Sequence, residues 1–255
     1  MPLQVVTIPC RSDNYAFLLH DELAGRTALI DAPEAAPIAA AAKSRGWGIE
    51  EIWITHHHGD HVDGVEALRR EFGSHVSGAA ADAHRLPSLD RHLRDEDVFD
   101  FAGHAVHVLD VSGHTVGHIA FHVPDASAAF TADSLMALGC GRVFEGTFDQ
   151  MWASLSRLAA LPPETMICSG HEYTAANGRF ALTIEPGNSA LISRVSAVAA
   201  ARAANQATVP SELSEELATN PFLRASRPEV KAALGMPNAT DSEVFAEIRT
   251  RKDNF

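Results

Sequence analysis

One segment, Thr55–His61 with the sequence THHHGDH, constrains the fold of this chain more than any other. The apolar, β-branched stretch ahead of it predicts a buried strand that runs directly into the histidines. Alternate side chains of an extended segment point the same way, so His56 and His58 can converge on one metal ion. Asp60 and His61 follow a glycine turn at the start of an expected helix. Four ligands in six residues suffice for half of a two-metal site, and a structural zinc finger has a different pattern.

Three further potential ligands stand just past other apolar stretches, in settings of small residues. They are His114 after Ala105–Val111, Asp133 after Ala128–Thr131, and His171 after Met166–Ser169. A single buried histidine is more often a hydrogen-bonded core residue than a ligand. Because all three accompany the cluster Thr55–His61, we expect them to belong to the same metal centre. We expect His57 and His118 to support that centre rather than to bind metal.

The distribution of residue types along the chain predicts two regions with different roles. All 14 histidines lie between His20 and His171, and the last 84 residues contain none. Residues 1–175 carry 11 Lys+Arg and 24 Asp+Glu, whereas residues 176–255 carry nine of each. The first region alternates short strands with helices, and strand signals fade from Ala175 onward. We therefore predict an α/β domain over residues 1–174 and a helical domain over residues 175–255.

The expected elements follow from hydrophobic periodicity and turn residues. Further expected strands are Gln4–Pro9, Tyr15–Leu19, Thr27–Asp31, Glu51–Thr55 and Ile119–Val123. Expected helices are Ala35–Ser44, Val62–Phe72, Phe148–Ala160, Ser189–Ala204, Ser211–Thr219, Glu229–Leu234 and Asp241–Arg251.

Charge and cysteine usage restrict the partners and the compartment. A formal net charge of −13 and the lack of a basic stripe argue against nucleic acid. No apolar run approaches the length of a membrane span, and Met1–Gln4 lacks the basic start of a secretory signal. Cys10, Cys140 and Cys168 are odd in number and far apart, which favours small buried thiols over disulfides. We expect a cytoplasmic protein.

These motifs resemble those of a known family. THHHGDH matches the HxHxDH signature of the metallo-β-lactamase superfamily, and His114, Asp133 and His171 match its later motifs in order. Within that superfamily the chain resembles the glyoxalase II family, the hydroxyacylglutathione hydrolases, over essentially its whole length. The segments that carry this resemblance are Ile8–Tyr15, Gly113–His118, Gly139–Thr147, Gly170–Thr174, Glu185–Asn188, Asn220–Arg224 and Arg249–Phe255.

The resemblance implies an αββα metallo-β-lactamase-type sandwich followed by a C-terminal helical domain. It implies two divalent metal ions, with Zn²⁺ expected and Fe²⁺ or Mn²⁺ as alternatives. One ion would be held by His56, His58 and His114. The other would be held by Asp60, His61 and His171. Asp133 would bridge both ions together with a hydroxide, so that Asp60 and Asp133 count as catalytic.

The implied reaction is the hydrolysis of S-D-lactoylglutathione to D-lactate and glutathione, a step of methylglyoxal detoxification, through attack of the metal-bridging hydroxide. A metal-activated water accounts for a site that needs no Ser-His-Asp triad. We expect a monomer that binds a small glutathione thioester and no membrane. The residues that the resemblance assigns to substrate binding are Arg142, Phe144, Tyr173, Arg249 and Lys252.

Two positions depart from the family pattern. Phe144 stands where some members have tyrosine, so a hydroxyl that could bind the substrate is missing. Ala132 precedes the bridging aspartate where glycine is familiar, and we expect it to adopt a negative φ angle. Neither departure removes a metal ligand.

Three alternative functions differ in testable ways. A glutathione persulfide dioxygenase on the same scaffold would bind a single Fe and consume O₂. A nuclease of the superfamily is opposed by the net charge of −13. A protein that binds metal without catalysis is opposed by the presence of all seven ligand positions.

Overall fold

A computed structural model describes residues 3–255; Met1 and Pro2, at the start of the predicted first domain and of the segment tested for a secretory signal, lie outside it. The chain divides into two compact units. Unit 1 holds the chain up to Asp110 together with Val116–Ala132, and unit 2 holds Val111–Thr115 together with Asp133–Phe255. These units are defined by the packing of the chain, whereas the domains 1–174 and 175–255 were predicted from sequence patterns. The predicted domain boundaries therefore stay a prediction.

The first sheet of unit 1 has six strands in the order β1-β2-β3-β4-β5-β6. β1, β2 and β3 pair antiparallel, whereas β3 through β6 pair parallel. The predicted strands in this region are present, and β4 is shorter than expected. β5 and β6 were not predicted, because their short sequences HVSGA and RHL lack clear alternation. The bounds are β1 Gln4–Cys10, β2 Asn14–Asp21, β3 Arg26–Ile30, β4 Glu51–Trp53, β5 His75–Ala79 and β6 Arg91–Leu93.

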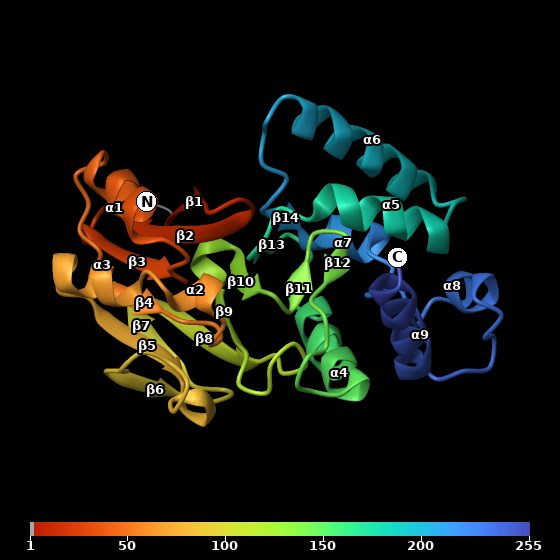
Figure 1. Cartoon of the computed structure of the whole chain (residues 1–255), viewed down its shortest axis with the longest axis horizontal. Helices are drawn as coiled ribbons and strands as arrows, with labels where there is room; N and C mark the ends of the chain where they lie inside the picture. Colours follow the sequence, from red (N-terminus) through yellow and green to blue (C-terminus); the bar gives the residue numbers. More distant parts are fainter. Residues whose placement is uncertain (1–2) are drawn as a thin grey trace. The chain divides into compact units, whose positions relative to one another are not determined.

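Helices α1 (Ala35–Lys43) and α3 (Val65–Phe72) pack against one face of this sheet (Figure 1). Their buried faces join one apolar core with alternate strand residues. The alanines of α1 leave little side-chain entropy to lose, which favours a helix. The core residues include Leu18, Leu29, Ile38, Ile52, Leu68 and Val76.

The other face of the sheet meets β7 to β10, the part of the second sheet that lies in unit 1. Trp53 contacts Phe99, Phe101 and Phe121 at ring-centroid distances of 5.2, 5.4 and 5.5 Å. These rings fill the interior of a two-sheet sandwich, since aromatic side chains bury large apolar areas. β7 was not predicted. The bounds are β7 Val98–Phe101, β8 His104–Asp110, β9 Ile119–Val123 and β10 Ala128–Ala132.

The single helix predicted over Val62–Phe72 is wrong in one respect, because the chain forms two helices here. A short helix α2 (Gly59–Val62) ends before α3 begins at Val65. The break falls at Gly64, where a Cβ atom would lie 2.9 Å from the carbonyl oxygen of Ala32 and 2.9 Å from a backbone nitrogen. Only glycine tolerates so close a backbone approach. As a result, Asp60 and His61 sit within α2 rather than at the start of a long helix.

Unit 2 is mainly helical, as the fading strand signals indicate. Thr147 caps α4 and Thr240 caps α9, each through a capping box. The predicted helix Ser211–Thr219 starts two residues late, because Ser211 and Glu212 pair with β13 instead. The elements are β11 Leu135–Met136, β12 Gly139–Cys140, α4 Phe148–Ala159, β13 Met166–Ser169, α5 Thr174–Ile184, α6 Ser189–Ala203, β14 Ser211–Glu212, α7 Leu213–Thr219, α8 Pro228–Ala233 and α9 Asp241–Asp253.

Aromatic contacts hold the helices of unit 2 together. The ring of Phe222 lies 6.1 Å from that of Phe180 on α5 and 6.0 Å from that of Phe245 on α9, measured between centroids. All three side chains are buried. Within residues 3–255, none of the helices has the length and apolar character that crossing a membrane requires.

His104 links two acidic residues of unit 1, and we expect this contact to make the stability of the fold depend on pH. Its Nδ1 lies 2.6 Å from a carboxylate oxygen of Asp125, and its Nε2 lies 2.9 Å from one of Asp21. These bonds, to Asp125 first, raise the pKa of His104. A raised pKa stabilises the folded state fully at pH values below the pKa of the unfolded chain, which is about 6.5 for histidine. This stabilisation is lost as the pH rises through the pKa that His104 has in the folded state.

We therefore expect His104→Gln to lower the melting temperature more at about pH 6 than at about pH 9. Thermal unfolding at both values measures the difference. His92→Gln, at an exposed position on β6, serves as the matched control and should show no such dependence. An equal loss at both pH values would contradict the charged role of His104.

Candidate metal centre

The histidine cluster of unit 1 lies where β4 ends and α2 begins. The Nε2 atom of His56 lies 3.1 Å from the Nδ1 atom of His58. Two ring nitrogens this close match the separation of neighbouring ligands around one ion at Zn–N distances of about 2.0–2.1 Å. The alternation predicted for an extended segment thus brings these two histidines together, and His57 turns elsewhere.

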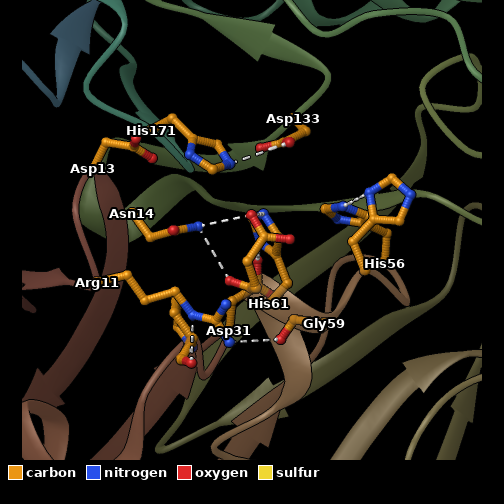
Figure 2. A network of polar contacts seen from close by, with 12 residues as sticks. Arg11, Asp13, Asn14, Asp31, His56, Gly59, His61, Asp133 and His171 are labelled. Carbon is orange, nitrogen blue, oxygen red and sulfur yellow. Dashed lines mark hydrogen bonds and ion pairs between the residues drawn. The ribbon is translucent and has the colours of Figure 1, made fainter.

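A buried hydrogen-bond network sets which nitrogen each histidine presents. Asp31, just past β3, accepts from the backbone N–H and the hydroxyl of Thr55 at 2.8 Å each. It also accepts from Nδ1 of His61 at 2.7 Å (Figure 2). Because the Thr55 hydroxyl proton is directed at Asp31, its oxygen accepts from Nδ1 of His56 at 3.0 Å. Both histidines therefore use Nδ1 for this network and direct Nε2 at other predicted ligands, in the carboxylate–histidine arrangement typical of metal sites.

Asp60 is held by the turn between β1 and β2. The side-chain amide of Asn14 donates to a carboxylate oxygen of Asp60 at 3.0 Å and to its backbone oxygen at 3.2 Å. Arg11 donates to the carbonyl of Gly59 and pairs with Asp63 at 2.6 Å. The same carboxylate of Asp60 lies 3.9 Å from Nε2 of His61. The turn thus orients Asp60 toward the metal-binding side of His61.

The two histidines expected to support the centre make different contacts, and their supporting role stays a prediction. His57 pairs with the buried carboxylate of Asp82 at 3.0 Å, away from His56. His118 is fully buried and stacks on the ring of His56, with 4.6 Å between centroids. Stacking restricts the rotation of the His56 ring and so helps to hold its Nε2 in place.

Unit 2 brings the three later ligand candidates together. One carboxylate oxygen of Asp133 lies 3.5 Å from Nε2 of His114 and 3.4 Å from Nε2 of His171; Figure 2 shows the second of these pairs. Nδ1 of His114 donates to the backbone carbonyl of Arg142 at 2.8 Å. A carbonyl only accepts, so Nδ1 carries a proton, and Nε2 is the nitrogen that faces Asp133. This oxygen of Asp133 therefore lies close to the Nε2 atoms of two predicted ligands, and its bridging role stays a prediction.

Backbone packing around these ligands is tight. A Cβ atom at Gly141 would lie 2.0 Å from the backbone oxygen of Asp133 and 3.0 Å from Nδ1 of His114. Gly113, with φ of 147°, would bring a Cβ atom within 2.6 Å of Met151. Glycine is therefore required at both positions to let the backbone pass beside the ligands.

Two residues of this network were missed by sequence reasoning. Asp31 and Asn14 touch proposed ligands, yet neither lies within a histidine motif. A signal was present for Asp31, because it follows the apolar strand β3 directly, as the predicted ligands follow theirs. Its role depends on β3 and β4 being parallel neighbours, which places both carboxyl ends at one edge of the sheet.

The residues assigned to substrate binding all lie in unit 2. Phe144 is 62% exposed and its ring lies 5.3 Å from that of His114. Tyr173 stacks on His171 at 4.7 Å. Both aromatic side chains therefore border the ligand set. Their contact with substrate stays a prediction.

The predicted cations differ in exposure. Arg142 is exposed, and Lys252 is half-buried, with its ammonium group 5.3 Å from the ring centroid of Phe180. Burial first, and then the neighbouring Arg249, Arg179 and Arg142, lower the pKa of Lys252. Arg249 is only 3% exposed and donates to the carbonyl of Cys140 and to Asp253.

The expected negative φ at Ala132 is wrong: the angle is 42°. The chain leaves β10 here and must turn sharply toward Asp133, and the left-handed conformation makes that turn. Alanine adopts it at a cost of about 1–2 kcal/mol, whereas glycine does so freely. The familiar glycine of the family therefore has a conformational reason at this position.

The three cysteines are free and buried, as expected. Burial raises the pKa of the Cys10 thiol to about 12 and that of Cys140 to about 11, and it raises the pKa of Cys168 as well. All three are therefore protonated thiols at neutral pH. None has the character of a metal ligand or a nucleophile.

Comparisons with known proteins define the class. The family model described as "Metallo-beta-lactamase superfamily" matches residues 13–171. The structure of the B3 metallo-β-lactamase BLEG-1 has a TM-score of 0.68 at 18% identity, over 86% of this chain and 99% of that chain. This likeness confirms the predicted fold, an α/β metallo-β-lactamase-type sandwich followed by a helical domain. The chain belongs to the metallo-β-lactamase superfamily.

The family within that superfamily is also clear. The model described as "Hydroxyacylglutathione hydrolase C-terminus" matches residues 172–255. A hydroxyacylglutathione hydrolase of Roseobacter denitrificans is 65% identical over 255 residues, with 100% of both chains covered. The chain belongs to the hydroxyacylglutathione hydrolase (glyoxalase II) family. The structure of TTHA1623 in a di-iron-bound form has a TM-score of 0.57 at 27% identity, over 67% of this chain and 91% of that chain.

Proposed function

We propose that this chain hydrolyses S-D-lactoylglutathione and related 2-hydroxyacylglutathione thioesters to a 2-hydroxy acid and glutathione. The observation that carries the proposal is the set of ring nitrogens. His56, His61 and His114 each use Nδ1 for one hydrogen bond and direct Nε2 at another predicted ligand, namely His58, Asp60 and Asp133 respectively. Neutral imidazoles and carboxylates are the donor set of divalent transition metals, and the residues present therefore fit the expected ions.

The ligand assignment is part of the proposal. His56, His58 and His114 would hold one ion, and Asp60, His61 and His171 the other, with Asp133 shared by both. When bound, the ions would supply an activated water as the nucleophile at neutral pH and positive charge for the developing oxyanion. The metals would number two, with Zn²⁺ expected; the di-iron form of the relative TTHA1623 supports both the number and Fe as an alternative.

The residues of the chain would orient these groups. Asp31 and the carbonyl of Arg142 hold the rings of His61 and His114, and Asn14 holds Asp60. The leaving thiolate has a pKa near 8.5, so the site needs no strong general acid. This is consistent with a centre made of metal ligands and their hydrogen-bond partners alone.

Local cations of unit 2 would receive the anionic glutathione, because a chain with a net charge of −13 repels it at long range. Lys252 and Arg142 have exposed area, and Tyr173 and Phe144 border the ligand set. Arg249 would contribute its charge from a buried position. Phe144 would offer an apolar contact in place of a tyrosine hydroxyl.

We expect Lys252→Ala to raise KM about tenfold or more while kcat stays within about twofold. A hydrogen bond to a charged group contributes about 1.5–3 kcal/mol, and this one would bind substrate and transition state alike. Steady-state kinetics provides the measurement. Arg251→Ala, one residue away at an exposed position, is the matched control. An unchanged KM in the Lys252 variant would place the glutathione carboxylates elsewhere.

Turnover of S-D-lactoylglutathione by the metal-loaded protein tests the function, followed through the loss of thioester absorbance. Chelation should abolish turnover and Zn²⁺ should restore it. Absence of turnover with two ions bound would reject the proposal. The alternative, a persulfide dioxygenase with one Fe, would instead consume O₂ with glutathione persulfide. We further propose a cytoplasmic monomer, which sedimentation and fractionation can test.

A further inference from the structure

A short hairpin joins two parts of the proposed metal centre. Strands β11 and β12 pair Leu135 with Cys140 and Met136 with Gly139. Asp133 lies just before this hairpin and Arg142, whose carbonyl binds His114, lies just after it. A hairpin of two-residue strands is not stable by itself. All six of its residues are nevertheless buried, so its backbone polar groups need partners from elsewhere.

Four buried side chains of the helical region supply those partners. Asn220 donates to the carbonyls of Met136 and Gly139 at 3.1 and 2.9 Å. Glu216 accepts from the N–H of Leu138 at 2.9 Å. Asn177 donates to the carbonyl of Ala137 at 3.1 Å, and Arg249 donates to the carbonyl of Cys140 at 2.9 Å. We call these four side chains, Asn177, Glu216, Asn220 and Arg249, the clamp.

The clamp is itself fixed by a buried ion pair. Glu216 is fully buried and pairs with Arg194, which is also buried. Its carboxylate further accepts from Ser211 at 2.6 Å and from Asn220 at 3.1 Å. Buried charges require such pairing, because an isolated one would be costly. Glu216 and Asn220 therefore have a single defined geometry, which they impose on the hairpin.

The hairpin transmits this geometry to the ligands. Gly141 donates to the carbonyl of Ser134 at 3.1 Å, so the two ends of the hairpin are held side by side. The backbone of Asp133 is thereby packed against Gly141, and Arg142 presents its carbonyl to Nδ1 of His114. Displacing the hairpin would move the carboxylate of Asp133 and at the same time release the ring of His114.

We propose that Asn177, Glu216, Asn220 and Arg249 are positioning residues for the metal centre, acting through the β11–β12 hairpin on Asp133 and His114. The helical region thus determines metal affinity in addition to any contact with glutathione. This inference rests on the ligand assignment of the proposed function. Residues that orient metal ligands typically contribute about ten- to a hundredfold in metal affinity.

The test compares Asn220→Ala with Asn188→Ala, using Zn²⁺ and a competing chelator. Asn188 caps α6 and donates to the carbonyl of Ala218 at 3.0 Å, so its replacement also removes an amide and a cap but leaves the hairpin untouched. We expect Zn²⁺ binding to weaken about tenfold or more for Asn220→Ala and to stay within about twofold for Asn188→Ala. Wild-type affinity in a folded Asn220→Ala protein would overturn the proposal.

Asn177→Ala provides a second variant if Asn220→Ala does not fold. It removes one bond to the hairpin and should weaken Zn²⁺ binding by a smaller factor; wild-type affinity there would equally overturn the proposal. His114→Ala separates the two hypotheses. If His114→Ala weakens Zn²⁺ binding and the clamp variants do not, the positioning role of the clamp is rejected. If His114→Ala binds Zn²⁺ with wild-type affinity, the ligand assignment itself is rejected.

Discussion

Replacing Asp133 by asparagine is expected to lower kcat/KM for the glutathione thioester by at least about a thousandfold, since metal charge contributes several kcal/mol to such reactions. One oxygen of this carboxylate lies within 3.5 Å of both His114 and His171 through their Nε2 atoms. An amide is neutral and its oxygen is a weaker ligand, so it lacks the negative charge with which a carboxylate would hold two ions. We expect less than the full complement of metal to remain bound. Steady-state kinetics and elemental analysis of the purified protein measure both effects.

Asp100→Asn is the matched control for this variant. Asp100 is exposed on β7 and accepts from the N–H of Gly103 in the following turn. The same chemical change there should leave metal content and kcat/KM as in the wild type. An Asp133→Asn protein that retained its metal and most of its activity would exclude a bridging role for this residue.

The second large effect is expected for Asp31→Asn, at a position outside the predicted ligand set. Asparagine would direct its NH₂ group at either Thr55 or Nδ1 of His61, both of which donate to Asp31 in the wild type. If His61 responds by moving its proton to Nε2, the ring can no longer bind a metal there. We expect activity and metal affinity to fall at least about a hundredfold, because a wrong histidine tautomer and a lost metal-orienting carboxylate each have effects of this size.

Asp82→Asn is the matched control, because Asp82 binds a histidine that is not a predicted metal ligand. Asp82 is as buried as Asp31 and pairs with Nδ1 of His57 at 3.0 Å. His57 is not a proposed ligand, so this variant should lose stability but keep its metal affinity. Comparable loss of metal in both variants would show that Asp31 acts through folding rather than through the orientation of His61.

The site could be predicted to the extent that it follows local rules. His56 and His58 lie on alternate positions of an extended segment, and their convergence follows from strand geometry alone. His114, Asp133 and His171 each follow an apolar strand, and these three residues lie close together within unit 2. Their mutual distances could not be predicted, because they depend on how segments far apart in the chain pack.

The parts that could not be predicted depend on such long-range packing. Asp31 acquires its role only because β3 and β4 are parallel neighbours. The end of α2 depends on how closely Gly64 approaches the carbonyl of Ala32. The φ angle of Ala132 was predicted from residue type, yet the turn toward Asp133 overrode that preference. For Asp31 and Gly64, contacts between residues far apart in the sequence were decisive, whereas at Ala132 the decisive feature is a sharp turn of the backbone.

The buried thiols have a consequence for an enzyme whose product is itself a thiol. Each turnover releases glutathione beside a protein with three cysteines, and thiol–disulfide exchange proceeds through the thiolate. With pKa values of about 12 for Cys10 and about 11 for Cys140, almost none of either thiol ionises at neutral pH, and neither is accessible. Cys168 is buried as well, and burial raises its pKa. We therefore expect the native enzyme to be inert toward oxidised glutathione, and a thiol-specific dye added to the reaction to count only the product.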